Sequence, residues 1–332
     1  MTRFGIEFIP STEVIDIAYY ARIAEERGFH NIWITDHYFN RPCFVALTHV
    51  ALYTNSIKIG SGVTNPYHIN PAVIASSIAT IDEISGKRTI LGIGAGDRLT
   101  LKALGITRKK SLAAMRESIE IIRQLWAGKR VTFQGEIFNI PKAKLGFKTE
   151  RILPIYLAAQ GPKMTELAAE IADGVLINGS HPRDYVIAKT YLDQGSRKAK
   201  KTLENFEIAA YTAFSIDKDP QRALRLAKEV VAYIVAGSLP EVLERHDIPY
   251  EEALRLEQLL DQRKRQEVTE AVTSEMVEAF AVTGTIEECI DKIETLLKTG
   301  VTQIVCGAPL GRDVPRAIKD IGKKILPAFN ED

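Results

Sequence analysis

The chain opens with FGIEFIPSTEVIDIAYYARIAEERGFHNIWIT, residues 4–35, and this stretch decides the fold. Its two ends, Phe4 to Phe8 and Asn31 to Thr35, are short apolar runs of the kind that form buried strands. Between them, apolar residues recur at helical spacing after the candidate caps Ser11 and Thr12, and Gly28 ends the segment. The stretch therefore predicts a strand, a helix and a second strand in one parallel βα unit.

The same alternation of strand and amphipathic helix recurs to the end of the chain and predicts an α/β fold, a (β/α)8 TIM barrel. We expect a single domain over residues 1–332 with two insertions. One, at about 129–153, has the pattern of a small β-hairpin, and the other, at about 237–285, is charged and helical. The eight predicted strands are Phe4 to Phe8, Asn31 to Thr35, Ile57 to Gly60, Thr89 to Ile93, Ile155 to Ala158, Gly174 to Ile177, Glu207 to Ser215 and Gln303 to Cys306.

Composition and charge narrow the class of protein. With 45% hydrophobic and 26% charged residues among 332, the chain has the profile of a globular protein with a sizeable core. The 43 Lys and Arg nearly balance the 42 Asp and Glu, so no overall field favours nucleic acid or an anionic membrane. The basic residues in LRLEQLLDQRKRQEV, 254–268, have acidic neighbours and favour a solvated helix face.

The sequence shows no pattern of a signal peptide, a membrane span or a disulfide framework. The first residues, MTRFGIEFIP, lack a signal-peptide pattern, and no apolar run has the length of a membrane span. The three cysteines, Cys43, Cys289 and Cys306, lie far apart and form no CxxC pair. We therefore expect a cytoplasmic protein with no membrane partner. We also expect a homo-oligomer, a dimer or tetramer, because barrel enzymes often associate through their insertions.

Three carboxylates follow or interrupt predicted strands, at the end of the barrel where active sites form. Asp36 follows WIT and Asp97 follows LGIGAG, and each could equally be a helix cap or a structural hydrogen-bond acceptor. Glu7 interrupts the apolar run FGIEFI, where a carboxylate would lose hydration and needs a partner or a proton. A raised pKa at Glu7 would suit a general acid.

Small residues at strand ends predict room for a flat ring. Gly62, Gly94 and Gly96 are among these, although GIGAG has the wrong spacing for a dinucleotide fingerprint. AAQGPKM, Ala158 to Met164, leads into a helix whose free amides could bind phosphate. The residues that could add positive charge there, or serve as ordinary surface side chains, are Arg98, Lys102 and Lys163. We assign no metal, because His37 and His181 have no HxH or HExxH spacing.

Several strand-end motifs together resemble one family. They are FGIEF, WITDHY, GSGVTNP, LGIGAGD, LPIYLAAQGPKM, DGVLIN, AYTAFSID, ERHDIP and GVTQIVCGAPLG, in order from about residue 3 to residue 325. The chain resembles the 5,10-methylenetetrahydromethanopterin reductases of methanogenic archaea. These are barrels of the bacterial luciferase-like type that use coenzyme F420.

The resemblance implies a reversible hydride transfer between reduced coenzyme F420 and the pterin substrate methylenetetrahydromethanopterin, a step of methanogenesis, with no flavin or metal. It implies that Glu7 is the acid/base toward the pterin nitrogen and that Asp97 tunes it. A cis peptide is implied at Gly62 and Val63. The residues that the resemblance places around the cofactor are Thr35, Asp36, Gly62, Val63, Thr64, Gly94, Gly96, Ala159, Gln160, Gly161, Pro162, Lys163, Asn178 and Ser180.

The sequence departs from the family pattern at several places near the expected site. Ser61 and Ala95 replace prolines, the last motif reads Gly307 to Gly311 as GAPLG, and the stretch Phe39 to Cys43 differs from an Asn-rich loop. These departures leave open a paralogue that uses F420 on another substrate, such as an alcohol or sugar phosphate. An FMN-dependent monooxygenase and a barrel that only stores or senses the deazaflavin are further alternatives.

Overall fold

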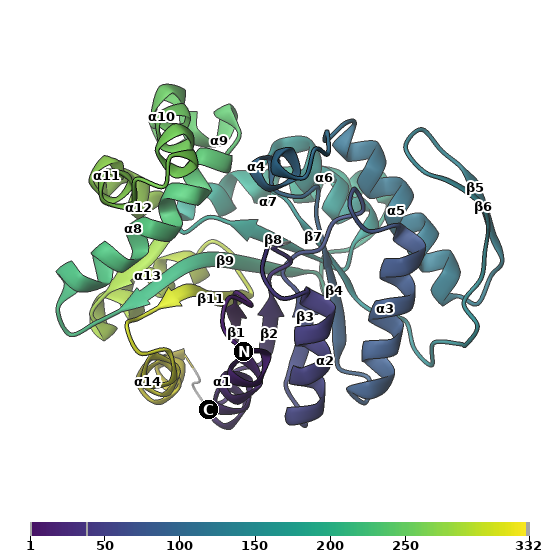
Figure 1. The fold of residues 1–332 in the computed structure, drawn as a ribbon, viewed down its shortest axis with the longest axis horizontal. Helices are drawn as coiled ribbons and strands as arrows, with labels where there is room; N and C mark the ends of the chain where they lie inside the picture. The colour runs from purple at the N-terminus through teal and green to yellow at the C-terminus, as the bar shows by residue number, and fades with distance from the viewer. Residues whose placement is uncertain (1, 38, 330–332) are drawn as a thin grey trace.

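The computed structural model of the chain describes residues 2–37 and 39–329 and contains a closed parallel barrel (Figure 1). Its strands follow the order β9-β11-β1-β2-β3-β4-β7-β8, and β8 pairs with β9 to close the ring. The (β/α)8 prediction is confirmed; Tyr38, the last residue of WITDHY, lies outside the described residues. The barrel strands are β1 (Arg3–Phe8), β2 (Asn31–Ile34), β3 (Lys58–Ser61), β4 (Thr89–Ile93), β7 (Ile155–Ala158), β8 (Gly174–Asn178), β9 (Glu207–Ile216) and β11 (Gln303–Leu310).

Helices surround the barrel and connect its strands (Figure 1). The first unit forms with α1 between β1 and β2 as predicted, and the buried face of α1 carries Ile17, Ala21 and Ala24. The predicted caps are wrong: Glu13 precedes the helix, and its side chain makes no capping hydrogen bond. The helices along the barrel are α1 (Val14–Glu26), α2 (Cys43–Tyr53), α3 (Pro71–Ile84), α4 (Arg98–Ala103), α5 (Ser111–Trp126), α6 (Pro162–Ile171), α7 (Pro182–Ala199), α8 (Pro220–Gly237), α13 (Ile286–Leu297) and α14 (Val314–Asp320), followed by short turns at Ile321–Ile325 and Leu326–Phe329.

The core has an inner part and an outer part. Inside the barrel, Trp33 packs with Tyr156 and Val305, and its indole N–H donates to Gln303 Oε1 at 2.9 Å. Outside, alternate residues of the same strands, such as Ile32, pack against the surrounding helices. Every second strand residue therefore points into the barrel. Glu7, which lies opposite the inward-pointing Trp33, is one of them.

A ninth strand, β10 (Ala281–Gly284), was not predicted. It pairs in parallel with the far end of β9, at residues 213–216, while β8 pairs with residues 207–211. β11 pairs with one edge of β9. On the other edge, β8 pairs with the first half of β9 and β10 with its last four residues. The ten-residue β9 therefore projects past the barrel and carries β10 with it.

Two segments lie outside the regular βα pattern. Residues 129–153 contain the antiparallel strands β5 (Val131–Gln134) and β6 (Asn139–Ala143), which project at the right of Figure 1. Residues 237–285 contain β10 and four helices, which pack with α8 around a second apolar cluster that includes Ala213 of β9. We propose that both segments are insertions into one domain. The four helices are α9 (Pro240–Glu244), α10 (Tyr250–Asp261), α11 (Arg265–Ala271) and α12 (Ser274–Phe280).

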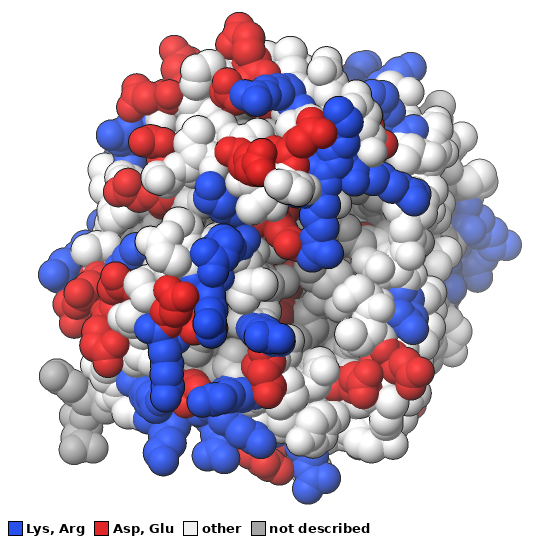
Figure 2. All heavy atoms as spheres, turned by 60° about the vertical axis from the view of Figure 1, so that its left-hand side comes forward, with Lys and Arg blue, Asp and Glu red and all other residues white. Residues whose placement is uncertain are grey.

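The charges of the molecule are mixed in sign. On the face that Figure 2 shows, Lys and Arg alternate with Asp and Glu, and blue side chains border a hollow near the middle. None of the helices in the described part of the chain combines the length and apolar character that crossing a bilayer requires. The mixed charges on this face agree with the balanced composition of the chain.

Candidate active site

Glu7 is the carboxylate that β1 carries into the barrel. It lies opposite Trp33 in the strand register and is 9% exposed. The Ala308 amide of β11 donates a 3.2 Å hydrogen bond to its Oε2, and no cation pairs with it among the described residues. Burial raises the pKa of Glu7 to about 7, and the Ala308 hydrogen bond lowers it by a smaller amount. The side chain is therefore suited to exchange a proton near neutral pH.

Tyr211 faces Glu7 from β9, and sequence reasoning assigned it no role. Its hydroxyl donates to the Gly62 carbonyl at 3.3 Å, in the peptide that joins Gly62 to Val63. That peptide is cis, as the resemblance implied. Burial, and then the nearby Glu7 carboxylate, raise the pKa of the Tyr211 phenol well above its ordinary value. The motif AYTAFSID contains this residue, but a tyrosine within a predicted strand is expected to pack in the core.

Asp36 lies just beyond the end of β2, the strand that pairs with the Glu7 strand β1. Thr64 Oγ1 donates to its Oδ2 at 2.6 Å, and His68 Nε2 lies 3.8 Å from the same oxygen. Burial raises the pKa of Asp36, and the Thr64 hydrogen bond opposes this change. The structure thus brings together two predicted residues, Asp36 and Thr64, and adds His68, which had no sequence signal beyond being a histidine.

The loops after β7 and β8 meet at the same end of the barrel. Gln160 Nε2 donates to the Asn178 carbonyl at 2.6 Å and joins them. Gly161 is the residue before α6, and Pro162 begins that helix as predicted. Ser180 is buried, and its Oγ has no hydrogen-bond partner in the described part of the chain. The remaining predicted residues of these loops are Ala159, which is buried, and Lys163, which is exposed.

Comparisons with known proteins decide the family. A model described as luciferase-like monooxygenase matches residues 8–303. A 5,10-methylenetetrahydromethanopterin reductase from Archaeoglobus fulgidus is 50% identical over 329 residues, which is 98% of this chain and 99% of the relative. Another, from Methanolobus tindarius, is 48% identical over 336 residues and covers 97% and 99% of the two chains.

A solved structure, a coenzyme F420 dependent tetrahydromethanopterin reductase from Methanopyrus kandleri, matches with a TM-score of 0.91 at 38% identity over 99% of each chain. The chain belongs to the 5,10-methylenetetrahydromethanopterin reductase family. The resemblance that the strand-end motifs carried is thereby confirmed.

Two departures from the reductase family's motifs leave the contacts of Glu7 in place. Ala308 acts through its backbone amide, which every residue except proline supplies. Ser61 is buried and its hydroxyl donates to the Gly92 carbonyl at 2.7 Å, which ties β3 to β4. Neither substitution changes the polar groups that face the carboxylate.

Asp97 occupies a different place from Glu7 in this reductase. It caps α4, where its Oδ2 accepts from the Thr100 amide at 2.7 Å, and its side chain is exposed. Its charge acts on His37. Burial lowers the pKa of that imidazole, and the Asp97 carboxylate raises it by a smaller amount. The pKa of Glu7 has other causes, so a tuning role for Asp97 stays a prediction.

The basic residues near α4 are already paired. Arg98 Nη2 lies 2.7 Å and Lys102 Nζ 3.3 Å from the carboxylate of Glu257 on α10. These pairs dock α4 on the 237–285 segment. Glu257 itself is largely buried, so its carboxylate is the group that these two cations neutralise.

The open end of the barrel fits a polar ligand with a flat ring. Thr35 and Ser180 are buried, and neither hydroxyl has a hydrogen-bond partner in residues 2–37 and 39–329. Buried hydroxyls without partners are costly unless a ligand or water satisfies them. Gly94 lies where a Cβ would come within 3.0 Å of Ala158 and Val63, so the wall there stays close-packed and flat. These features fit F420 as the group that the family uses.

Metal-binding groups are absent from the part of the chain that the structure describes. No three of its His, Cys, Asp and Glu side chains gather into a set that could hold an ion.

Proposed function

We propose that the protein transfers a hydride reversibly between reduced coenzyme F420 and 5,10-methylenetetrahydromethanopterin, a reaction of one-carbon metabolism. Identity of 48–50% to named reductases over nearly the whole chain supports the reaction and its cofactor. The observation that carries the proposal is the buried Glu7, which lies in the barrel and whose pKa is raised to about 7.

Glu7 is the proton donor and acceptor of this proposal. When the methylene carbon is reduced, the pterin nitrogen that it leaves requires a proton, and the protonated carboxyl of Glu7 supplies it. In the reverse direction the carboxylate accepts the same proton. Its ordinary pKa of about 4.3 would leave too little acid at neutral pH, so burial makes the side chain usable in both directions.

Residues around the open end are proposed to hold the cofactor. When bound, reduced F420 supplies the hydride. The unpartnered hydroxyls of Thr35 and Ser180 would bind its polar groups, and the Gly62–Val63 peptide would support one face of its ring. Amides at the start of α6, after Gly161, would face its phosphate.

Anaerobic mixing of the purified protein with reduced F420 and methylenetetrahydromethanopterin tests the reaction directly. The return of deazaflavin absorbance at a rate proportional to enzyme supports the proposal. Binding of F420 without turnover of this pterin would transfer the assignment to a paralogue with another substrate, and binding of FMN alone would reject the cofactor.

The assembly is proposed to be a homo-oligomer. Exposed apolar side chains gather on α1 to α3, where Tyr19, Leu52 and Val73 are 52%, 65% and 53% exposed. Exposed apolar side chains on helices that pack side by side would suit a subunit contact. Sedimentation of the wild type and of Leu52→Glu tests this: the variant should sediment as a smaller species, and a monomeric wild type would reject the proposal.

The compartment is proposed to be the cytoplasm. All three cysteines are free and buried, which agrees with a reducing environment. Fractionation of source cells with an antibody to the chain would test this, and recovery in a membrane or extracellular fraction would reject it.

A further inference from the structure

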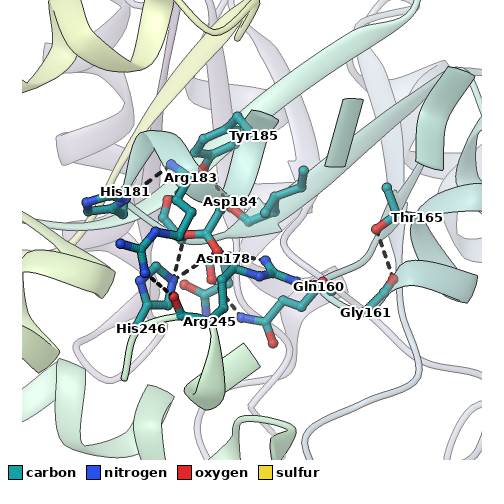
Figure 3. Close-up of polar contacts among 12 residues, drawn as sticks. Gln160, Gly161, Thr165, Asn178, His181, Arg183, Asp184, Tyr185, Arg245 and His246 are labelled. Carbon is teal, nitrogen blue, oxygen red and sulfur yellow. Dashed lines mark hydrogen bonds and ion pairs between the residues drawn. The ribbon is translucent and has the colours of Figure 1, made fainter. Parts of the chain in front are cut away.

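A buried ionic cluster lies next to the loops that follow β7 and β8 (Figure 3). Asp184, in the first turn of α7, accepts from Arg245 Nη1 at 2.7 Å, and its two oxygens lie 3.0 and 3.1 Å from His246 Nε2. The side chains of Arg245, His246 and Asp184 are only 9%, 4% and 3% exposed. Arg245 and His246 belong to the 237–285 segment, so the cluster joins that segment to the barrel.

The cluster contacts both loops. Arg245 Nη2 also donates to the Gln160 carbonyl at 3.4 Å, and Gln160 in turn donates to Asn178 (Figure 3). On the other side, Gly179 packs against Asp184: a Cβ there would lie 2.8 Å from Oδ2. Arg245 thus contacts the first loop directly, and Asp184 supports the second.

Stability alone is a weak explanation for this arrangement. Removing two charges from water costs several kcal/mol per ion, and apolar residues of equal volume often do as well or better. A second apolar cluster already holds the 237–285 segment on α8 and β9. An arginine with its rigid fork of donors can do what apolar packing cannot: it can fix the position of a backbone carbonyl.

We propose that Arg245 and Asp184 are positioning residues that hold the loops at Gln160–Gly161 and Asn178–Ser180 in the arrangement that binds F420. The inference rests on the proposed function for the identity of the ligand. It assigns to the 237–285 segment a part in cofactor affinity, although neither residue touches the cofactor.

Arg245→Lys tests this in the full-length protein. Lysine keeps the charge but replaces the rigid fork of two nitrogens with a single ammonium on a flexible stem, so we expect the contact to the Gln160 carbonyl to weaken. We expect the Kd for F420, measured by titration of its fluorescence, to rise about tenfold or more. The KM for F420 should rise more than kcat falls, and the KM for the pterin should change less than twofold. Amide hydrogen exchange at residues 159–163 and 178–181 should accelerate.

Arg265→Lys is the matched control, because Arg265 lies in the same segment but pairs with Glu229 at the surface. It should leave every one of these quantities unchanged. Asp184→Asn, which keeps the shape of the side chain and removes its charge, is the second variant and should weaken F420 binding in the same direction if Arg245→Lys does not fold.

The outcomes separate two failures. If the wild type does not bind F420, the proposed function fails. If the wild type binds it and both variants bind equally well, the positioning role alone is wrong. Weaker binding with unchanged hydrogen exchange in the two loops would also overturn it, because the loss would then come from a direct contact.

Discussion

Oε2 of Glu7 occupies the space that a Cβ at Gly307 would need. The carbonyl of Thr212 lies against the same position from the β9 side. Only glycine at residue 307 therefore lets β11 approach β1 and β9 while the carboxylate keeps its hydrogen bond to the Ala308 amide.

Gly307→Ala should lower turnover about 100-fold, because a displaced acid/base group loses its alignment with the reacting nitrogen. Steady-state kinetics at saturating F420 measures this. Gly146→Ala is the control, since a Cβ at that position has no atom within 4 Å, and it should behave as wild type. Full activity of Gly307→Ala would show that Glu7 does not need its observed place.

Glu7→Gln should lower turnover by at least about 100-fold in both directions, the lower end of what general acid/base catalysis supplies. Glutamine can still accept from the Ala308 amide, so the fold of the site is kept. The Kd for F420, measured separately by fluorescence, should stay within about twofold. A loss of less than tenfold in turnover would remove Glu7 from the mechanism.

Glu7→Gln should also change how stability depends on pH. The folded protein holds the Glu7 proton up to about pH 7, whereas the unfolded chain releases it near pH 4.3, so wild-type stability falls as pH rises between these values. The full effect is on the order of 3 kcal/mol. Chemical denaturation should show the variant to be more stable than wild type at pH 8 and nearly equal at pH 4.5. Equal stability at both pH values would contradict the raised pKa.

Asp97→Asn separates the two roles considered for Asp97. Asparagine caps helices as well as aspartate, so α4 should keep its stability, whereas Asp97→Ala should cost about 1 kcal/mol. The loss of charge should lower the pKa of His37, followed by NMR titration, because a carboxylate favours the charged imidazole. The pH profile of kcat should keep its Glu7 limb; a shift of that limb would support direct tuning of Glu7.

Much of the barrel could be predicted because its signals are local. Runs such as Thr89 to Ile93, flanked by amphipathic helices, mark parallel strands without any knowledge of contacts. Glu7 could be singled out for the same reason, since a carboxylate inside an apolar strand conflicts with its neighbours. The four-residue β10 gave no such signal: AVTG follows α12 directly, and only pairing with β9 makes it a strand.

The parts of the site that sequence reasoning missed are those that depend on distant segments. The Ala308 amide is a backbone group 301 residues from Glu7, and the residue type at that position gives no sign of the contact. Arg245 lies within the motif ERHDIP and Asp184 in none of the motifs, and neither attracts attention in the sequence because charged residues are usually solvated. Asp97 shows the reverse: its capping role was visible in the sequence as an alternative, and the structure contains that cap.

The path of the chain around β9 makes the neighbouring segment transferable. It leaves the sheet after Ile216 and returns at Ala281, which pairs with Ala213, three residues before Ile216 on β9. Residues 217–280 therefore form a cassette whose two ends are both held by the pairing of β9 with β10. A chimera that received this cassette from a relative would inherit the donor's Arg245 and Glu257 equivalents together, and with them the contacts that hold the Gln160 loop and α4.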